Sequence, residues 1–320
     1  MLDYSIITPV YNGQEFIENT ILSVLNSADN SKLNYEYIVV DDGSTDNTEK
    51  ILSSYQDRIR YVYQENMGQA LAINHGLKLA SGKYCTIINA DDPIVSSDLF
   101  LMSKIALDKN TNLVGTYPDW YIIDSVGKVK NTVRVRDYSL VEMVGNFNCL
   151  VGPGGVFRTT AGQKIGGWNS HFKFVPDYDF WLRLLRYGEY LHLPIVLANW
   201  RTHEKSISIS SRGSLMAKER IKVIEDYLIQ NPQTPEKIKK SAKANSIYRA
   251  AVLCYFDPTI DGKRLLFQAL KANLFVVLRK NLAVNLYLLF MPVSGLALKK
   301  IKKIGFLEKY IEIVQRNLRW

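Results

Sequence analysis

Two pairs of adjacent carboxylates stand where apolar runs of this sequence end. Asp41 and Asp42 follow the run YEYIVV, and Asp91 and Asp92 follow YCTIINA. Because neighbouring carboxylates repel each other, a ligand is a good reason to place two of them together. A carboxylate at a strand end can accept hydrogen bonds from a uracil N–H or from ribose hydroxyls. The first pair therefore predicts nucleotide recognition.

The second pair predicts a metal site. Hard oxygen ligands that lie close together attract Mg²⁺ or Mn²⁺, which usually keeps several waters and shares phosphate oxygens with the substrate. The alternative for Asp91 and Asp92 is an Asp-Pro turn with a capping role near Ser96 and Ser97. One pair for a nucleoside and one for metal-bridged phosphates form a more specific pattern than either pair alone.

The elements that must position these pairs alternate along the first part of the chain. Short β-branched runs predict strands with helices between them, and this order indicates a mainly parallel α/β sheet. The predicted strands are Tyr4–Val10, Tyr35–Val40, Ile59–Gln64 and Tyr84–Asn89, with helices near Phe16–Leu25, Asn47–Tyr55 and Ala70–Ala80. Ligands of such sheets bind beyond the carboxyl ends of the strands. The clusters TPVYNG, DDGSTD and NADDP all stand there.

Other features of the sequence disfavour several protein classes. GLKLASGKY is one residue too long for a Walker loop, and no G-x-G-x-x-G opens a helix after a strand. P-loop ATPases and dinucleotide dehydrogenases are therefore disfavoured. The three widely spaced cysteines match no zinc or disulfide pattern and indicate a reducing compartment. We expect no signal peptide at the N-terminus.

The net charge of +9 is concentrated near the end of the chain, where residues 257–320 hold 12 Lys and Arg against 4 Asp and Glu. Residues 281–298 carry no charge and are followed by Lys299, Lys300, Lys302 and Lys303. This pattern predicts an interfacial or re-entrant segment docked on anionic lipid. The alternative is a helical stripe packed on the catalytic domain. We expect no nucleic-acid partner, because long aliphatic runs interrupt the basic residues.

Five ordered motifs resemble those of the family 2 glycosyltransferases with the GT-A fold: TPVYNG, VVDDGSTDNT, ENMGQALAINHGL, SGKYCTIINADD and DYDFWLR. The resemblance covers about residues 3–210. It implies a nucleotide-sugar donor, a divalent metal (Mg²⁺ or Mn²⁺) and an inverting reaction. We expect a GT-A catalytic domain at 1–215, with a nucleotide-sugar-binding half at about 1–112 and an acceptor-side half at 113–215. A helical extension at 216–256 and a basic, membrane-associated helical tail at 257–320 would follow.

The resemblance implies a role for residues around the first carboxylate pair. Pro9, Tyr11 and Asp42 correspond to nucleoside-contacting positions of the family, and Asp41 lies beside them. Gln69 is predicted to reach the donor or simply to pack its helix against the sheet. The same two alternatives hold for Asn74, a few residues along the motif GQALAINHG.

The second pair corresponds to the family's D-x-D motif, here Asn89-Ala90-Asp91, with Asp91 as the implied metal ligand. Asn89 is a departure, since many members have Asp there. Its amide adds no charge, so metal affinity would rest mostly on Asp91 and Asp92.

The string PDYDFWLR resembles the family's EDYDLWLR, in which the first Asp is the catalytic base. That position is Asp177, while Pro176 replaces the customary Glu. The base would take the proton of an acceptor hydroxyl as its oxygen attacks the anomeric carbon. Asp179 is the rival, and the alternative for both is an acidic helix start favoured by the helix dipole. WRTHEKSIS resembles the family's closing loop, so Arg201 and His203 are predicted to contact the diphosphate.

The sequence thus predicts an inverting glycosyltransferase that moves a sugar from a nucleotide-linked donor, most simply a UDP-sugar, to a hydroxyl of a glycan or lipid-linked oligosaccharide. The expected setting is surface polysaccharide assembly at the cytoplasmic face of a membrane. One alternative is a sugar-phosphate nucleotidyltransferase, although TPVYNGQEF lacks the cations that such enzymes carry after the first strand. The other is a degenerate glycan-binding or scaffolding subunit, which Asn89 and Pro176 leave open.

Overall fold

A computed structural model of the chain describes residues 2–203, 213–253, 257, 259–280, 284, 285 and 289. The chain forms two compact units. The first, which we call the sheet unit, comprises Met1–Tyr138, Leu150–Phe172 and Pro176–Ser206. The second, the helical unit, comprises Ser139–Cys149, Lys173–Val175 and Ile207–Trp320.

The sheet unit is built on an eight-stranded sheet in the order β3-β2-β1-β4-β7-β5-β6, with β8 also paired to β5. The strands are β1 (Tyr4–Val10), β2 (Tyr35–Asp42), β3 (Arg60–Gln64), β4 (Tyr84–Ile87), β5 (Leu113–Ile123), β6 (Val129–Val133), β7 (Val156–Arg158) and β8 (Glu189–Arg201). β1 to β4 are parallel, β7 runs antiparallel to β4 and β5, and β8 is parallel to β5. The predicted α/β class with a mainly parallel sheet is confirmed.

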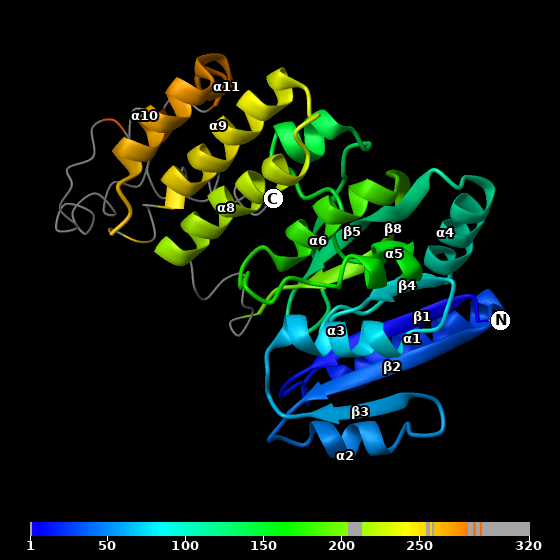
Figure 1. Cartoon of the computed structure of the whole chain (residues 1–320). Helices are drawn as coiled ribbons and strands as arrows, with labels where there is room; N and C mark the ends of the chain where they lie inside the picture. Colours follow the sequence, from blue (N-terminus) through cyan, green and yellow to red (C-terminus); the bar gives the residue numbers. More distant parts are fainter. Residues whose placement is uncertain are drawn as a thin grey trace. The chain divides into compact units, whose positions relative to one another are not determined.

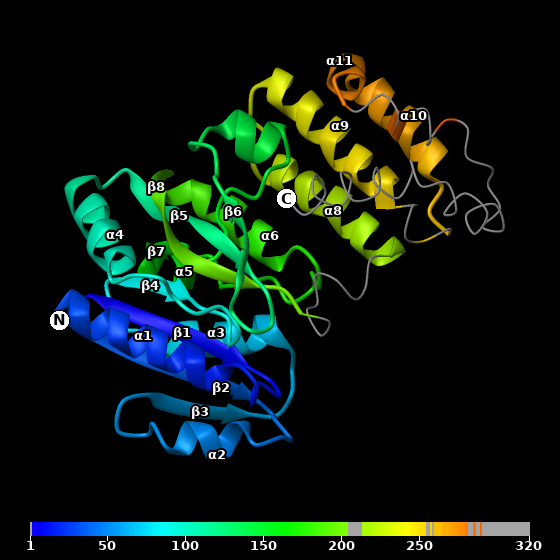
Figure 2. The ribbon, with the colours of Figure 1, turned by 180° about the vertical axis from the view of Figure 1, so that it is seen from behind.

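Helices cover both faces of this sheet (Figures 1 and 2). One face carries α1 (Ile17–Ser31), α2 (Thr48–Ser53) and α4 (Asp98–Lys109); the other carries α3 (Gln69–Leu79), α5 (Thr159–Lys164) and α6 (Pro176–Leu184). Because successive strand residues point to opposite faces, β1 needs apolar side chains on both. Tyr4 and Ile6 pack in the cluster under α1 and α4. Ile7 meets α3 at Gly76, where an added Cβ would lie 2.6 Å from its Cγ2.

The helical unit is a layer of helices: α8 (Ser214–Gln230), α9 (Glu236–Val252), α10 (Gly262–Ala272) and the short α11 (Leu274–Leu278). α9 lies between α8 and α10 and packs on both (Figures 1 and 2). Leu253, Leu266 and Val277 are among the buried residues of their shared core. The Asn245 side chain also donates to the Gly145 carbonyl of a short π-helix, Val141–Gly145.

The predicted membrane-docking stretch lies mostly outside the described residues. Most of residues 281–298 and all four lysines from Lys299 to Lys303 lie outside the described residues. Within the part of the chain that the structure describes, none of the helices combines the length and apolar character needed to cross a bilayer.

Candidate active site

The carboxyl ends of β1, β2 and β4 meet at one edge of the sheet, as predicted. Hydrogen bonds from backbone N–H groups to side chains join the first two loops: Asn12 N–H donates to Ser44 Oγ at 2.9 Å, and Thr45 N–H donates to Asn12 Oδ1 at 2.8 Å. The third loop joins them through α1, because Thr20 Oγ1 donates to the Ala90 carbonyl at 2.8 Å. The three polar clusters therefore form one site.

The first carboxylate pair is turned into the protein. Asp42 is buried and accepts from Gln64 Nε2 at 2.8 Å, Met67 N at 2.9 Å and Gly68 N at 2.8 Å. Asp41 is also buried and accepts from Ser44 N at 2.9 Å. Both carboxylates thus shape the loops at the sheet edge, and their direct contact with a nucleoside stays a prediction.

Glycine is required in the turn that follows this pair. Gly43 has a φ of 75°, and a Cβ there would lie 2.8 Å from the backbone nitrogen of Asn66. Any side chain would strain the backbone and push away the loop between β3 and α3. The turn at Gly43 therefore lets the loop between β3 and α3 pack against the end of β2.

Three large side chains stand exposed around the loops. Tyr11 is 53% exposed after β1, Tyr63 is 58% exposed near the end of β3, and Met67 is 56% exposed in the next loop. Pro9, in contrast, is buried within β1 opposite Val40. Exposed aromatic faces at a nucleotide site can stack on a base. Sequence reasoning identified Tyr11 and missed Tyr63, although Tyr63 pairs in register with Asp41.

A second layer behind Asp42 was also missed. Gln64, the last residue of β3, donates through Nε2 to Asp42, and its Oε1 accepts from His75 Nδ1 of α3 at 2.9 Å. Its signal was its place in the strand, since Gln64 is the register partner of Asp42. The chain of contacts ties α3 to the end of β2.

The second carboxylate pair divides into an inward and an outward member. Asp92 is 4% exposed, and its oxygens accept from Asn89 Nδ2 at 2.9 Å and from Arg201 N at 2.7 Å. Burial, followed by the charge of Asp91, raises the pKa of Asp92 well above the ordinary aspartate value. The Asp91 side chain is 29% exposed, and its Oδ2 lies 3.0 Å from His203 Nε2. Asp91 is the member that faces outward.

Asn89 completes this network. Its Oδ1 accepts from Gln69 Nε2 at 3.0 Å, while its Nδ2 donates to Asp92. The amide can do both at once, which a carboxylate cannot. The Asn that departs from D-x-D therefore links α3 to the buried Asp92 and adds no third charge to the site.

These residues fit a hard divalent cation that is held only partly by protein. Asp91 offers a carboxylate oxygen and His203 an imidazole nitrogen, both acceptable to Mn²⁺, and carboxylate suits Mg²⁺. Among the residues described, no group of three or more His, Cys, Asp or Glu side chains could enclose an ion. The remaining ligands would be phosphate oxygens and water. Asp92 fits less well, because its oxygens already accept two hydrogen bonds.

Arg201 was predicted to contact the diphosphate, but its side chain is bound inside the protein. It is 4% exposed, and its Nε donates to the Asp91 carbonyl at 2.8 Å while Nη1 donates to the carbonyls of Asp124 and Ser125. The guanidinium carbon also lies 5.0 Å from the ring centre of Phe16. This arginine secures the backbone of Asp91 in place of the predicted diphosphate contact, because its donors are already used inside the protein.

The two candidate bases differ in the same way. Asp179 is buried, and its Oδ2 accepts from Arg183 Nε at 2.7 Å, one helical turn along α6. Asp177, in the first turn of α6, is partly exposed. Removal from water, together with the nearby charge of Asp179, raises the pKa of Asp177 despite hydrogen bonds from the backbone. Asp177 is thus better suited to accept a proton.

A loop between α5 and α6 contacts the last turn of α6 and the helix α3. Arg183 donates to the carbonyls of Ile165 and Gly167 at 2.7 and 2.6 Å. Asn74 of α3 donates to the Trp168 carbonyl at 2.8 Å and accepts from Trp168 N at 2.6 Å. Asn74 therefore packs α3 against this loop, where the predicted alternative was packing against the sheet, and its contact with the donor stays a prediction.

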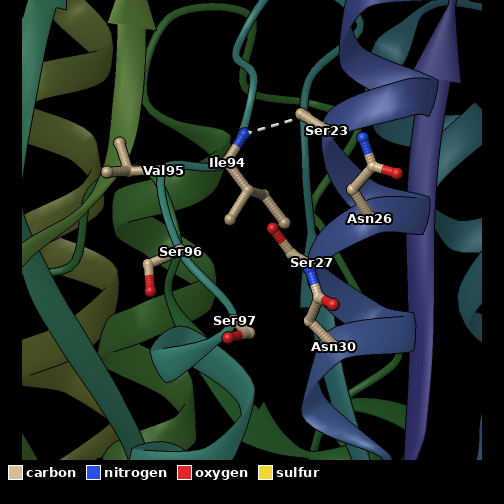
Figure 3. Close-up of a pocket in the computed structure, with 8 residues that line it drawn as sticks. All are labelled: Ser23, Asn26, Ser27, Asn30, Ile94, Val95, Ser96 and Ser97. Carbon is tan, nitrogen blue, oxygen red and sulfur yellow. Dashed lines mark hydrogen bonds between the residues drawn. The ribbon is translucent and has the colours of Figure 1, made fainter.

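A separate pocket of about 400 Å³ lies between α1 and the segment after NADDP (Figure 3). Its lining consists of Ser23, Asn26, Ser27, Asn30, Ile94, Val95, Ser96 and Ser97. None of the predicted site residues lines it, and no charged side chain does. We do not assign this pocket to the active site.

Known proteins resemble the chain in sequence. A model described as Glycosyl transferase family 2 matches residues 5–153. An uncharacterized glycosyltransferase of Rickettsia typhi is 32% identical over 228 residues, covering 68% of this chain and 69% of the relative. The Escherichia coli protein UDP-Glc:alpha-D-GlcNAc-diphosphoundecaprenol beta-1,3-glucosyltransferase WfgD is 29% identical, covering 72% of this chain and 89% of that protein. The chain spans only about a third of three longer rickettsial relatives.

Solved structures resemble its fold. S. aureus TarS 1-349 in complex with UDP-GlcNAc has a TM-score of 0.57 at 16% identity, over 89% of this chain and 91% of that one. The mannosyltransferase PcManGT from Pyrobaculum calidifontis, in complex with GDP-Man and Mn²⁺, has a TM-score of 0.55 at 14% identity, over 89% and 78%. Likenesses at such low identity concern the fold alone.

Proposed function

The chain belongs to glycosyl transferase family 2, and from this premise we propose that it is an inverting enzyme acting on a UDP-sugar. The acceptor we propose is a hydroxyl of a glycan or of a lipid-linked oligosaccharide. Two similar proteins support UDP as the nucleotide, since the TarS structure contains UDP-GlcNAc and the E. coli relative is a UDP-Glc-dependent glucosyltransferase by name. Surface polysaccharide synthesis is the setting that we propose.

The observation that carries this proposal is the difference in exposure and hydrogen bonding between Asp91 and Asp92. Asp92 is buried and hydrogen-bonded, so it holds the strand end in shape. Asp91 is partly exposed beside His203, and Arg201 secures its backbone from behind. A rigid outward carboxylate at the carboxyl ends of parallel strands is where a metal-bridged diphosphate would bind.

Asp91 and His203 would hold Mg²⁺ or Mn²⁺ against the diphosphate of the donor. When bound, such an ion neutralises charge on the departing nucleotide. The presence of Mn²⁺ in the PcManGT structure supports this assignment. Tyr11 and Tyr63 would offer their exposed rings to the base. Asp42 and Gln64 would keep the adjoining loop in shape.

Asp177 would take the proton from the acceptor hydroxyl as its oxygen attacks the anomeric carbon. A single displacement needs one base and no enzyme nucleophile, and the product then has inverted configuration. The raised pKa of Asp177 brings the carboxylate closer to the basicity that such a proton transfer needs. Asp179 is committed to Arg183 and would position α6.

We also propose that the protein associates peripherally with the cytoplasmic face of a membrane through its C-terminal region. The E. coli relative acts, by its name, on a sugar linked to diphosphoundecaprenol, which is a lipid. A lipid-linked acceptor would place the reaction at a membrane surface. The excess of cations in residues 257–320 suits an anionic one.

A donor-hydrolysis screen tests this function. Purified protein is incubated with a panel of nucleotide sugars and Mn²⁺ or Mg²⁺, with and without a chelator, and the released nucleotide is identified. We expect UDP from at least one UDP-sugar, loss of the activity with the chelator, and its loss in Asp91→Asn. Asp57→Asn, which changes an exposed aspartate of the sheet unit, is the matched control and should retain full activity.

Two outcomes would contradict the proposal. Formation of pyrophosphate from a sugar phosphate and a nucleoside triphosphate would indicate a nucleotidyltransferase. Release of UDP that is equally fast in wild type and Asp91→Asn would show that Asp91 holds no metal.

A further inference from the structure

The last two described helices carry an exposed face of mixed apolar and basic character. On the apolar side, Phe275 is 74% exposed and Leu278 62% exposed, and Phe267 and Leu274 are also exposed. Phe267 belongs to α10, and the other three side chains belong to α11. We call them, with the exposed cations beside them, the α10–α11 face.

The cations of this face far outnumber its acids. Lys263, Arg264, Lys271 and Arg279 are exposed. Asp261 is the single acidic residue of residues 261–280, and it caps α10 by accepting from Arg264 N at 2.9 Å. The charge of the face is therefore strongly positive.

The fold of the helical unit explains why these residues point outward. Leu266, Ala269 and Val277 are buried in the core shared with α9. With 3.6 residues per turn, the residues Arg264, Phe267 and Lys271 fall on the opposite side of α10. Asn273 accepts from Val276 N at 3.2 Å and starts α11, in which Val277 is buried while Leu274, Phe275 and Leu278 are exposed. Among the described helices of this unit, α10 is separated from α8 by α9 (Figures 1 and 2).

Apolar side chains gathered on a surface usually mark an interaction site. Lysine and arginine beside exposed Phe and Leu form the pattern of helices that lie in the interface of a bilayer, with the apolar side chains among the acyl chains and the cations at anionic headgroups. We propose that the α10–α11 face is the surface by which this protein docks on an anionic lipid bilayer. The inference rests on the proposed membrane association and names the side chains responsible for it.

Vesicle flotation of the full-length protein tests the proposal. Vesicles of phosphatidylcholine with phosphatidylglycerol are compared with vesicles of phosphatidylcholine alone. Lys271→Glu with Arg279→Glu should lower partitioning to the anionic vesicles at least about 25-fold, since each cation near such a surface contributes roughly a factor of five. The double variant Phe275→Ser with Leu278→Ser should also lower partitioning to the anionic vesicles. Added salt should not change the size of this loss, because the lost contacts with the acyl chains are apolar.

The controls come from the neighbouring helices of the same unit. Lys240→Glu on α9 and Ile229→Ser on α8 alter an exposed cation and an exposed apolar residue away from the face, and both should float like wild type. UDP release from a soluble donor and the melting temperature are measured for every variant. Because none of the changed residues belongs to the active site, UDP release should stay at the wild-type rate. The docking result can thus fail while the enzymatic result stands.

Three results would overturn the proposal. The first is failure of the wild-type protein to float with anionic vesicles. The same conclusion follows if the variants of the α10–α11 face float as well as the controls. A fall in melting temperature with unchanged flotation would show that the chain itself covers the face. Dissociation of a dimer in the Phe275 and Leu278 variant, again with unchanged flotation, would show that a second copy covers it.

Discussion

The two carboxylate pairs at the sheet edge look alike in sequence, but the structure uses them differently. Asp41 and Asp42 are both buried, and Asp42 accepts three hydrogen bonds from the loop after β3. In the second pair only Asp92 is buried, while Asp91 faces outward beside His203. An acidic pair at a strand end therefore does not by itself identify a ligand contact. A carboxylate oxygen that already accepts hydrogen bonds from the protein shapes a loop, whereas one without them can face a substrate.

The same distinction recurs in α6 and gives the largest expected effect. Asp177→Asn should lower the transfer rate by about 10²–10⁴, the usual contribution of a general base. Its folded-state pKa is raised, so the ionised side chain destabilises the fold at neutral pH. The substitution should therefore raise the melting temperature at pH 7 and leave it unchanged in acid below both pKa values. Steady-state rates and thermal scans of the same variant check both expectations, and unchanged turnover would contradict the assignment.

Asp179→Asn sharpens the comparison by changing the buried neighbour. It leaves Arg183 without its carboxylate, and breaking a buried ion pair costs about 3 kcal/mol of the free energy of unfolding. We expect this loss in a denaturant titration. Stability equal to that of wild type would show that Arg183 relies on its two carbonyl partners alone.

Asp42→Asn tests the first pair. An amide offers one acceptor oxygen where the carboxylate offers two, so at least one of the three donors on Asp42 loses its partner. The expected cost is about 1–3 kcal/mol in stability. The loop that carries Met67 should also loosen and raise the KM for the donor more than it lowers kcat. A variant with lower kcat and unchanged KM would point to a role in the chemistry instead.

The smallest expected effect is a displaced acid limb in the pH profile. Because partial removal from water raises the pKa of Asp177, transfer should begin to fall at a pH above the ordinary aspartate value of 3.8. The profile of kcat/KM with a soluble acceptor measures this midpoint. A midpoint at or below 3.8 would exclude Asp177 as the titrating base.

The architecture that places these residues was predictable where the strands are simple. β1 to β4 and the helices between them follow short apolar runs, and each predicted strand matches an observed one to within a few residues. β5 and β8 were not recognised. β5 contains Gly115 and Pro118, and its register with β8 shifts on both sides of these residues. Glycine and proline weaken the strand pattern, and only pairing with neighbouring strands compensates.

The sequence offered candidate residues for the site, but it did not predict the orientation of their side chains. Motif order placed Asp91, Asp177 and His203 among the candidates. It also suggested that Arg201 contacts phosphate, whereas this arginine is buried against carbonyl groups of distant segments. Such contacts join residues far apart in sequence, so no local pattern reports them. Tyr63 and Gln64 were missed for the same reason, because their partners lie on β2.

Manganese binding in the presence of UDP tests the central claim most directly, with Asp91→Asn and Asp92→Asn compared by electron paramagnetic resonance. We expect Asp91→Asn to abolish the UDP-dependent binding of Mn²⁺ and Asp92→Asn to retain it to within a few fold. Retained binding in Asp91→Asn, with loss only in Asp92→Asn, would contradict the account.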